Sequence, residues 1–237
     1  NLIQIALNSD VVGTARHESI HEFFNLLKKN GDEKIQDVLQ RVATAANEAE
    51  TIEEGLQAGI DSICDYMNWP FGHAYIYNDD HKALVSVDVW HMRDAVAYKE
   101  FKAASAQETI APGDGLIGEV YSDTTPMWIM DVAYSSVYAR KEVAARAGLK
   151  AAFAFPVFVG RKAVAVLEFY DSKAQIPDET LLHAMGNIGK QLGQVIERGQ
   201  FEERAALLET VIRSANDGIV ITKATLNKPG PEIVYVN

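Results

Sequence analysis

Residues 148–170 have the sequence GLKAAFAFPVFVGRKAVAVLEFY, and this stretch decides the fold. Two apolar runs, Ala151–Val159 and Ala163–Tyr170, flank the triplet Gly160-Arg161-Lys162. Because a tight hairpin turn needs a residue with positive φ, the glycine of the triplet marks the turn. The stretch therefore predicts two neighbouring antiparallel strands.

A second hairpin is predicted nearer the N-terminus. His73–Tyr77 and Ala83–Trp90 are rich in strand-forming residues, and the polar segment 78–81 between them is typical of a turn. Strands thus follow one another directly rather than alternating with helices, which indicates an α+β fold, an antiparallel sheet with helices on its faces. The other expected elements are helices over 51–67, 94–107, 117–120, 136–147 and 177–198, a short strand over 126–130, and a last strand pair over 218–223 and 232–237.

Apolar residues recur at coiled-coil spacing on both sides of this unit, which predicts long N- and C-terminal helices of coiled-coil type. The two series are Ile35, Leu39, Val42, Ala46 and Ala49, and Phe201, Ala205, Leu208 and Ile212. The first series favours pairing with another helix, with an ordinary amphipathic helix on the core as the alternative. Gly199 lies between Val195 and Phe201, a step of six residues rather than seven, so we expect a phase break there.

The composition excludes several classes of protein. The chain has 237 residues and a formal net charge of −11, which argues against nucleic acid or an anionic membrane surface as a partner. Its single cysteine, Cys64, excludes an internal disulfide framework and is expected to be a buried small hydrophobe. The sequence contains neither a run of about 18 apolar residues nor a secretion signal. We therefore expect a cytoplasmic protein with no membrane partner.

His17-Glu18-Ser19-Ile20-His21 matches the H-E-x-x-H pattern. On a helix, this spacing places His17 and His21 one turn apart for zinc, with Glu18 as the general base. The surroundings do not fit a metzincin, because Phe24 and Leu27 stand where glycine and a third histidine are needed. We expect a solvated helix surface and no metal site, and a zinc peptidase is the remote alternative.

Gly113-Asp114-Gly115-Leu116-Ile117-Gly118 matches the G-x-G-x-x-G pattern of dinucleotide sites. A dinucleotide fold needs a buried strand directly before the pattern, and Pro112 argues against one. The pattern therefore predicts a turn into a short helix. Since no nucleophile–base arrangement stands out either, we expect no catalytic residue in this chain.

A long irregular connection, about residues 91–150, is expected to cover one side of the sheet and to leave a small-molecule cavity beneath it. A filled, ligand-free core is the alternative. The candidate pocket residues are Trp90, Phe101, Trp128, Met130, Asp131, Tyr138, Phe153 and Phe155. Further polar side chains that could fix a ligand are His91, Arg93 and Arg140.

Several blocks of this sequence, in this order, resemble a GAF domain, a small-molecule-binding signalling module. The blocks are Asn68–Tyr75 (NWPFGHAY), Pro112–Val120 (PGDGLIGEV), Pro126–Val132 (PMWIMDV) and Gly148–Val157 (GLKAAFAFPV), which leads on to Ala163–Tyr170. The resemblance covers about 51–198. It shows neither a complete cyclic-nucleotide signature nor a cysteine in the middle connection for a bilin, so cyclic GMP and covalent bilin are both disfavoured, and the cofactor stays unknown.

The flanking segments complete the expected organisation. Residues 214–237 resemble the start of a PAS domain, as in bacterial sensor proteins that end in a histidine kinase or a cyclic di-GMP enzyme. The predicted parts are an N-terminal helical segment (1–33), a signalling helix (34–50), the GAF domain (51–198), a linker helix (199–213) and the truncated PAS start (214–237), and both chain ends suggest an excerpt. The resemblance implies a non-enzymatic sensor module that forms a homodimer through its flanking helices. A ligand-free dimerisation and relay scaffold is the alternative.

Overall fold

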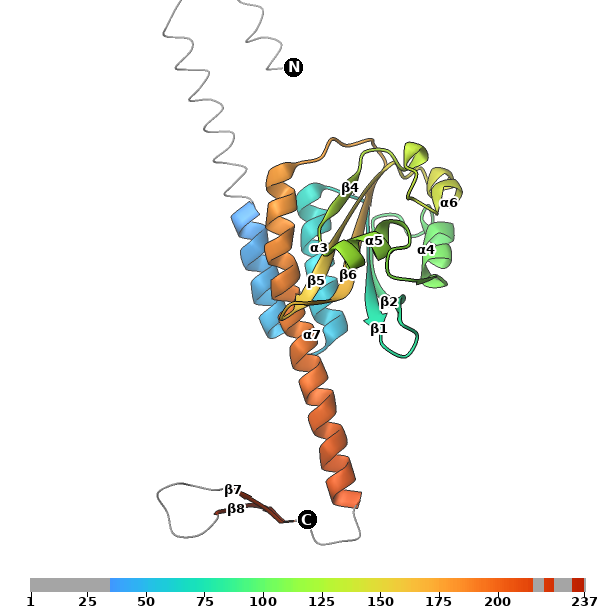
Figure 1. The fold of residues 1–237 in the computed structure, drawn as a ribbon. Coiled ribbons are helices and arrows are strands. Elements are labelled where there is room, and N and C mark those ends of the chain that lie inside the picture. Colours follow the sequence, from blue (N-terminus) through green and yellow to red (C-terminus); the bar gives the residue numbers. More distant parts are fainter. Residues whose placement is uncertain (1–34, 215–219, 224–231, 237) are drawn as a thin grey trace, which may run out of the picture.

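The computed structural model describes residues 35–214, 220–223 and 232–236. Its main unit is a six-stranded antiparallel sheet with strand order β3-β2-β1-β6-β5-β4 and helices on both faces (Figure 1), which confirms the predicted α+β class. The strands are β1 (Phe71–Asn78), β2 (Ala83–Met92), β3 (Thr109–Ile110), β4 (Met127–Ile129), β5 (Ala151–Val159) and β6 (Lys162–Asp171). The predicted segment 1–33, with its H-E-x-x-H motif, lies outside the described residues.

Both predicted hairpins are confirmed, and they meet in the middle of the sheet. β1 pairs with β2 and β5 pairs with β6, and Gly160 has the expected positive φ of 60° in the second turn. β1 and β6 then pair with each other in a register that sets His73 opposite Glu168. Side chains alternate between the two faces of a strand, so this register decides which residues share a face.

One face of the sheet, here named the helix face, is covered by α3 (Ile52–Met67), α7 (Glu179–Ser214) and a helix over residues 35–48 (Figure 1). Phe153, Phe155 and Phe169 pack there against these helices in one apolar cluster. Thr51 caps α3, since its hydroxyl accepts a hydrogen bond from the Glu54 amide at 3.1 Å.

The apolar series 35–49 packs against the core of the domain and does not stand apart from it. This corrects the expectation drawn from its coiled-coil spacing. Ile35, Val38, Val42 and Ala46 are buried, the first three within the cluster of the helix face. The Arg198 guanidinium of α7 also donates to the backbone carbonyls of Ala46, Asn47 and Ala49, where this helix ends. Its apolar seam is therefore covered by the chain itself, as in the alternative of an amphipathic helix packed on the core.

α7 approaches the sheet so closely that two of its positions have no space for a side chain. A Cβ atom on Gly189 would lie 2.2 Å from the Pro156 carbonyl oxygen, and one on Gly193 would lie 1.7 Å from that of Phe158. Further along, α7 continues through Gly199 without a break, and a Cβ there would lie 2.6 Å from Cγ1 of Ile52. Gly199 is thus a contact point between α7 and α3.

The opposite face, here named the cavity face, is covered by shorter elements of the long connection. These are α4 (Lys99–Ala106), α5 (Gly115–Asp123), the 3-10 helix η1 (Val132–Tyr134) and α6 (Lys141–Arg146). A helix predicted over 136–147 is correct only for its second half, because residues 136–140 are irregular. This irregular segment places Tyr138 and Arg140 beneath the connection, where both are buried.

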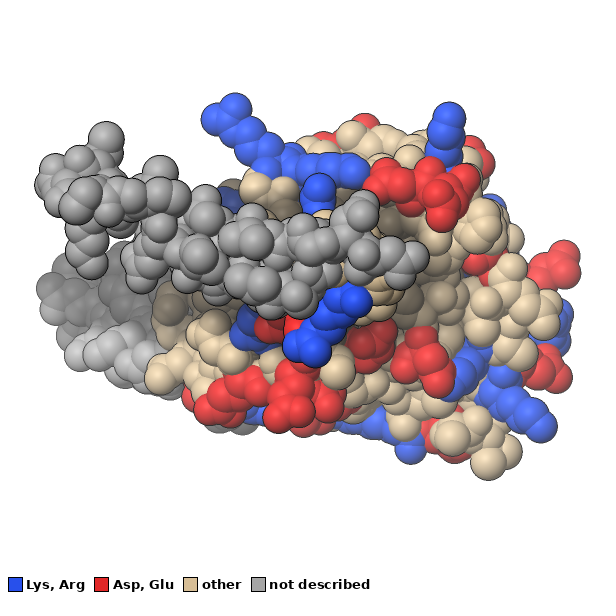
Figure 2. All heavy atoms as spheres, turned by 90° about the horizontal axis from the view of Figure 1, so that it is seen from below, with Lys and Arg blue, Asp and Glu red and all other residues tan. Residues whose placement is uncertain are grey.

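Beyond α7, the strands β7 (Val220–Lys223) and β8 (Glu232–Val236) pair antiparallel, so the predicted last strand pair is confirmed. Within the described ranges, no helix combines the length and apolar character needed to cross a bilayer. On the face shown in Figure 2, the described basic side chains lie among acidic ones instead of forming one continuous basic surface.

Candidate functional site

A buried ion pair lies at the centre of the cavity face. The guanidinium of Arg140 donates to both carboxylate oxygens of Glu168, at 3.1 Å and 2.6 Å. Tyr170 contacts both partners: its hydroxyl donates to Glu168 at 2.6 Å and accepts from Arg140 at 3.0 Å. Such a pair is stable in a low-dielectric interior only when the remaining polar atoms also find partners.

His73 completes this network from the neighbouring strand. Its Nδ1 lies 3.3 Å from a carboxylate oxygen of Glu168, and its Nε2 lies 3.0 Å from the Ser86 hydroxyl. The indole of Trp90 stacks on the imidazole with ring centroids 3.5 Å apart. These groups meet because positions 71, 73 and 75 of β1 and positions 166, 168 and 170 of β6 share the cavity face.

Burial and charge together shift the pKa values in this network. Burial would raise the pKa of Glu168, but the Arg140 charge and the hydrogen bonds from His73 and Arg140 lower it to about 2. Burial lowers the pKa of His73 more than the nearby Glu168 carboxylate raises it. The network therefore contains an ionised carboxylate, a guanidinium and a neutral imidazole near pH 7.

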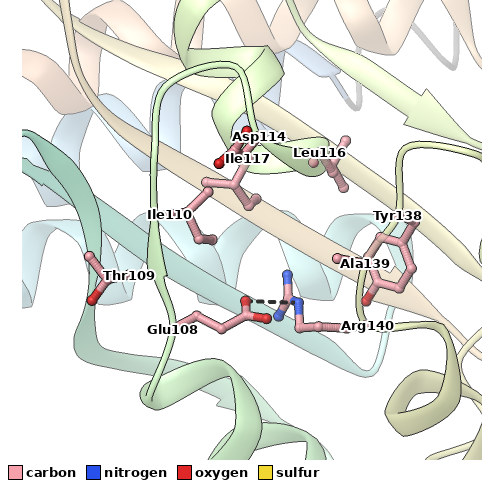
Figure 3. Close-up of a pocket in the computed structure, with 10 residues that line it drawn as sticks. Glu108, Thr109, Ile110, Asp114, Leu116, Ile117, Tyr138, Ala139 and Arg140 are labelled. Atoms are coloured by element: carbon pink, nitrogen blue, oxygen red, sulfur yellow. Dashed lines mark ion pairs between the residues drawn. The ribbon is translucent and has the colours of Figure 1, made fainter.

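Arg140 also forms the inner wall of a cavity of about 180 Å³ (Figure 3). Its Nε lies 3.1 Å from a carboxylate oxygen of Glu108, which is partly exposed on the loop between α4 and β3. The hydroxyl of Tyr138 is buried near that of Tyr170 but makes no hydrogen bond of normal geometry among the described residues. The lining residues are Glu108, Thr109, Ile110, Asp114, Gly115, Leu116, Ile117, Tyr138, Ala139 and Arg140.

The G-x-G-x-x-G pattern forms the turn into a short helix, as predicted, and this turn borders the cavity. Gly113 and Gly115 have positive φ values of 88° and 60°, which glycine adopts without strain. A Cβ on Gly118 would lie 2.3 Å from the Ala111 carbonyl oxygen. Asp114 occupies the N-cap position of α5, but its side chain makes no capping hydrogen bond. Its carboxylate is drawn at the cavity wall in Figure 3.

The candidate pocket residues are divided among three places. Trp90, Phe101 and Tyr138 surround the buried ion pair, and Tyr138 lines the cavity. Trp128, Met130 and Asp131 line a separate open hollow beside β4. Phe153 and Phe155 lie on the helix face, because they alternate with Ala152 and Ala154, which belong to the cavity-face cluster. The structure does not bring these candidates together.

The additional polar candidates are divided as well. Arg140 lies at the ion pair, whereas His91 contacts Asp61 of α3 at 2.7 Å, and Arg93 donates to Asn68 at 2.6 Å. Glu168, His73 and Glu108 were not among the sequence candidates. The signal for Glu168 was present, since a single carboxylate within an apolar strand must have a buried partner.

A side chain of α3 connects the cavity face to the helix face. The amide of Gln57 donates to the Trp90 carbonyl at 3.0 Å and accepts from the Trp90 amide at 3.1 Å. α3 in turn packs against α7, where a Cβ on Gly59 would lie 2.8 Å from a methyl of Leu192. Because the Trp90 ring stacks on His73, Gln57 links the buried network of the cavity face to the helices of the helix face.

Cys64 is buried on the helix face, as expected. Burial raises the pKa of its thiol, and Asp61 and Asp65 raise it further. A thiol in this state is a poor nucleophile, because the reactive form is the thiolate. Among the described residues, no group of three potential metal ligands comes together.

The fold matches several solved structures at low sequence identity. A free methionine-R-sulfoxide reductase from Neisseria meningitidis, solved with its substrate, is 15% identical with a TM-score of 0.58, covering 71% of this chain and 91% of that chain. The GAF domain of a phosphoenolpyruvate-protein phosphotransferase from Coxiella burnetii is 14% identical with a TM-score of 0.62, covering 73% and 98%. The GAF domain of A. aeolicus nlh2 in an inactive state is 18% identical with a TM-score of 0.55, covering 70% and 97%.

These structures share the fold with this chain. No curated protein sequence matches it. The family model described as "GAF domain" matches residues 49–197, which is more than half of the chain. The chain therefore belongs to the GAF domain family.

Proposed function

We propose that this GAF domain is the regulatory sensor module of a bacterial, cytoplasmic signal-transduction protein. It binds a small molecule in the cavity bounded by Glu108, Tyr138 and Arg140 and relays occupancy through α3 and α7. The observation that supports this most is the buried, unpartnered Tyr138 hydroxyl at the wall of a cavity next to an ion pair. A buried polar group without a partner costs free energy, which a hydrogen-bonding ligand would recover.

Sensing is favoured over catalysis by the chemistry of the cavity. Some proteins of this fold are reductases, as the Neisseria meningitidis neighbour shows. In this chain the single cysteine, Cys64, lies on the helix face, across the sheet from the cavity, so it supplies no thiolate there. The network instead holds its charged groups in fixed, paired positions, which suits binding.

The relay part of the proposal rests on the length of α7. This helix extends over 36 residues, and its second half has large apolar side chains in solvent. Phe201 is 68% exposed and Leu208 is 54% exposed, one heptad apart on the helix. We propose that two copies pair along this part of α7 and pass the signal to a PAS domain that begins with β7 and β8, and then to a histidine kinase or cyclic di-GMP enzyme.

Fragment binding followed by methyl NMR tests the sensing proposal. We expect small polar fragments to shift the methyl signals of Ile110 and Ile117 at the cavity, and not those of Ile60 and Ile188 on the helix face. The variant Tyr138→Trp, which fills the cavity, should abolish these shifts. If no fragment shifts the cavity methyls of the folded wild type, the ligand-free scaffold becomes the better account.

Light scattering tests the pairing proposal. We expect a dimer that becomes a monomer in the double variant Phe201→Glu, Leu208→Glu, because both charges would enter the paired surface. The matched control is Glu202→Lys with Glu209→Lys, which changes charge nearby on the same exposed helix. A wild type that stays monomeric at high concentration contradicts the proposed dimer.

A further inference from the structure

The groups around the cavity contain more negative than positive charge. Arg140 is paired with two carboxylates, Glu168 at 2.6 Å and Glu108 at 3.1 Å. His73 adds no charge near pH 7, because burial lowers its pKa. Asp114 supplies a further carboxylate at the cavity wall. With three carboxylates and one guanidinium, this cluster has a formal net charge of −2.

Glu108 is the carboxylate best placed to pair with an added positive charge. It is about one third exposed, whereas Glu168 has no exposure. Burial raises the pKa of Glu108, and Arg140 only partly opposes this. Arg140 already donates to four other oxygens: the hydroxyl oxygens of Ser105 and Tyr170 and both carboxylate oxygens of Glu168. Glu108 thus shares a guanidinium whose charge Glu168 already neutralises.

An anionic ligand would be favoured by Arg140, whose charge Glu168 and Glu108 already share, and by the first turn of α5, where the backbone N–H groups have no partner within the helix. Asp114 at the N-cap brings its own carboxylate to this end of the helix. An anion in the cavity would face Asp114 at one end of the lining and Glu108 at the other (Figure 3). Ile110, Leu116 and Ile117 supply the apolar part of the lining. The lining therefore matches a short hydrocarbon chain that ends in a positive charge.

We propose that the cavity binds a small organic cation of the alkylammonium class, with Glu108 as its counter-ion. The inference rests on the proposed sensing function and specifies its ligand class. The ammonium group donates to Glu108 and to the oxygen of Tyr138, and the carbon chain lies against Ile110 and Ile117. A volume of about 180 Å³ has space for about six water molecules, so the ligand is small.

The experiment compares three probes of equal size: n-butylammonium, butyrate and 1-butanol. Binding is followed through the methyl signals of Ile110 and Ile117 in the full chain near pH 7. We expect n-butylammonium to bind at least about tenfold more tightly than the other two, since a hydrogen bond to a charged partner has about this effect. Glu108→Gln should weaken its binding by about tenfold, and Asp114→Asn by a few-fold.

Glu142→Gln is the matched control, because Glu142 is exposed on α6 and outside the cavity lining. Its affinity for n-butylammonium should stay within about twofold of the wild type. Unchanged helix-face methyl signals of Ile60 and Ile188 show that each variant is folded. If butyrate binds more tightly, or if neither carboxylate variant weakens binding, the cation inference is wrong while the cavity remains a ligand site. If none of the probes binds, the cation inference is also wrong, and the fragment experiment decides the sensing proposal separately.

Discussion

The two faces of the central sheet are stabilised in different ways. On the helix face, Phe155 and Phe169 stack with centroids 5.8 Å apart beneath α7, and Gly189 and Gly193 bring that helix onto the backbone of β5. On the cavity face, charged groups such as Glu168 and Arg140 replace part of the apolar contact. A close-packed apolar face transmits strain, whereas a satisfied buried polar network holds its charged groups in fixed positions. The difference suggests that one face recognises and the other transmits.

Breaking the ion pair should have the largest effect on stability. Glu168→Gln leaves the buried Arg140 without its main counter-ion, so we expect the free energy of unfolding to fall by about 3–5 kcal/mol. Urea denaturation measures the change. The double variant Glu168→Gln, Arg140→Met removes both charges and should recover most of the loss. If the double variant is as unstable as the single one, the unpaired charge of Arg140 does not cause the loss of stability.

Acidification should weaken the cavity face first. The pKa of Glu168 falls from its ordinary 4.5 to about 2 on folding, so its contribution is complete above pH 4.5 and is lost between 4.5 and 2. This lowering of the Glu168 pKa corresponds to a contribution of about 3 kcal/mol to the free energy of unfolding. His73, whose pKa is also lowered, adds a further loss as the pH falls below 6.5. Urea denaturation at a series of pH values should show this decline in the free energy of unfolding. In the double variant Glu168→Gln, Arg140→Met, the part of the decline below pH 4.5 should be missing.

Two glycines of α7 test how closely this helix packs on the helix face. Gly193→Ala forces a methyl group against the Phe158 carbonyl, so we expect a loss of about 1–3 kcal/mol. Gly186→Ala is the matched control, because a Cβ at Gly186 meets no atom within 4 Å. It should stabilise the protein by up to about 1 kcal/mol through helix propensity. Thermal unfolding gives both values, and a Gly193→Ala protein as stable as the wild type would contradict the close approach of α7.

The fold could be predicted from the sequence because its signals are local. The hairpin through Gly160 and the cap at Thr51 each depend on residues a few positions apart. The site could not be predicted in the same way, since His73 and Glu168 are 95 residues apart and meet only through strand register. Alternation alone does not say which side of β5 faces the cavity, so the sequence does not separate Phe153 and Phe155 from the pocket candidates. The start of α6 does not follow from the sequence, because only the tertiary structure shows that residues 136–140 are irregular and place Tyr138 and Arg140 inward.

In the proposed relay, occupancy of the cavity reaches the helices of the helix face. Gln57 is the connection of α3 that lies nearest the buried network, because it binds the backbone of Trp90, whose ring stacks on His73. Gln57→Ala should therefore separate binding from its transmission. The methyl shifts of Ile110 and Ile117 would remain in this variant.

Hydrogen exchange with and without saturating n-butylammonium tests directly whether ligand binding in the cavity reaches α3 and α7. We predict that the ligand changes exchange both around the cavity, in residues 108–123 and 137–147, and in α3 and α7. In Gln57→Ala the change should be confined to the cavity segments. If the changes in the wild type are also confined to the cavity segments, and α3 and α7 are unaffected, then binding in the cavity is not transmitted to the helices and the proposed relay is wrong.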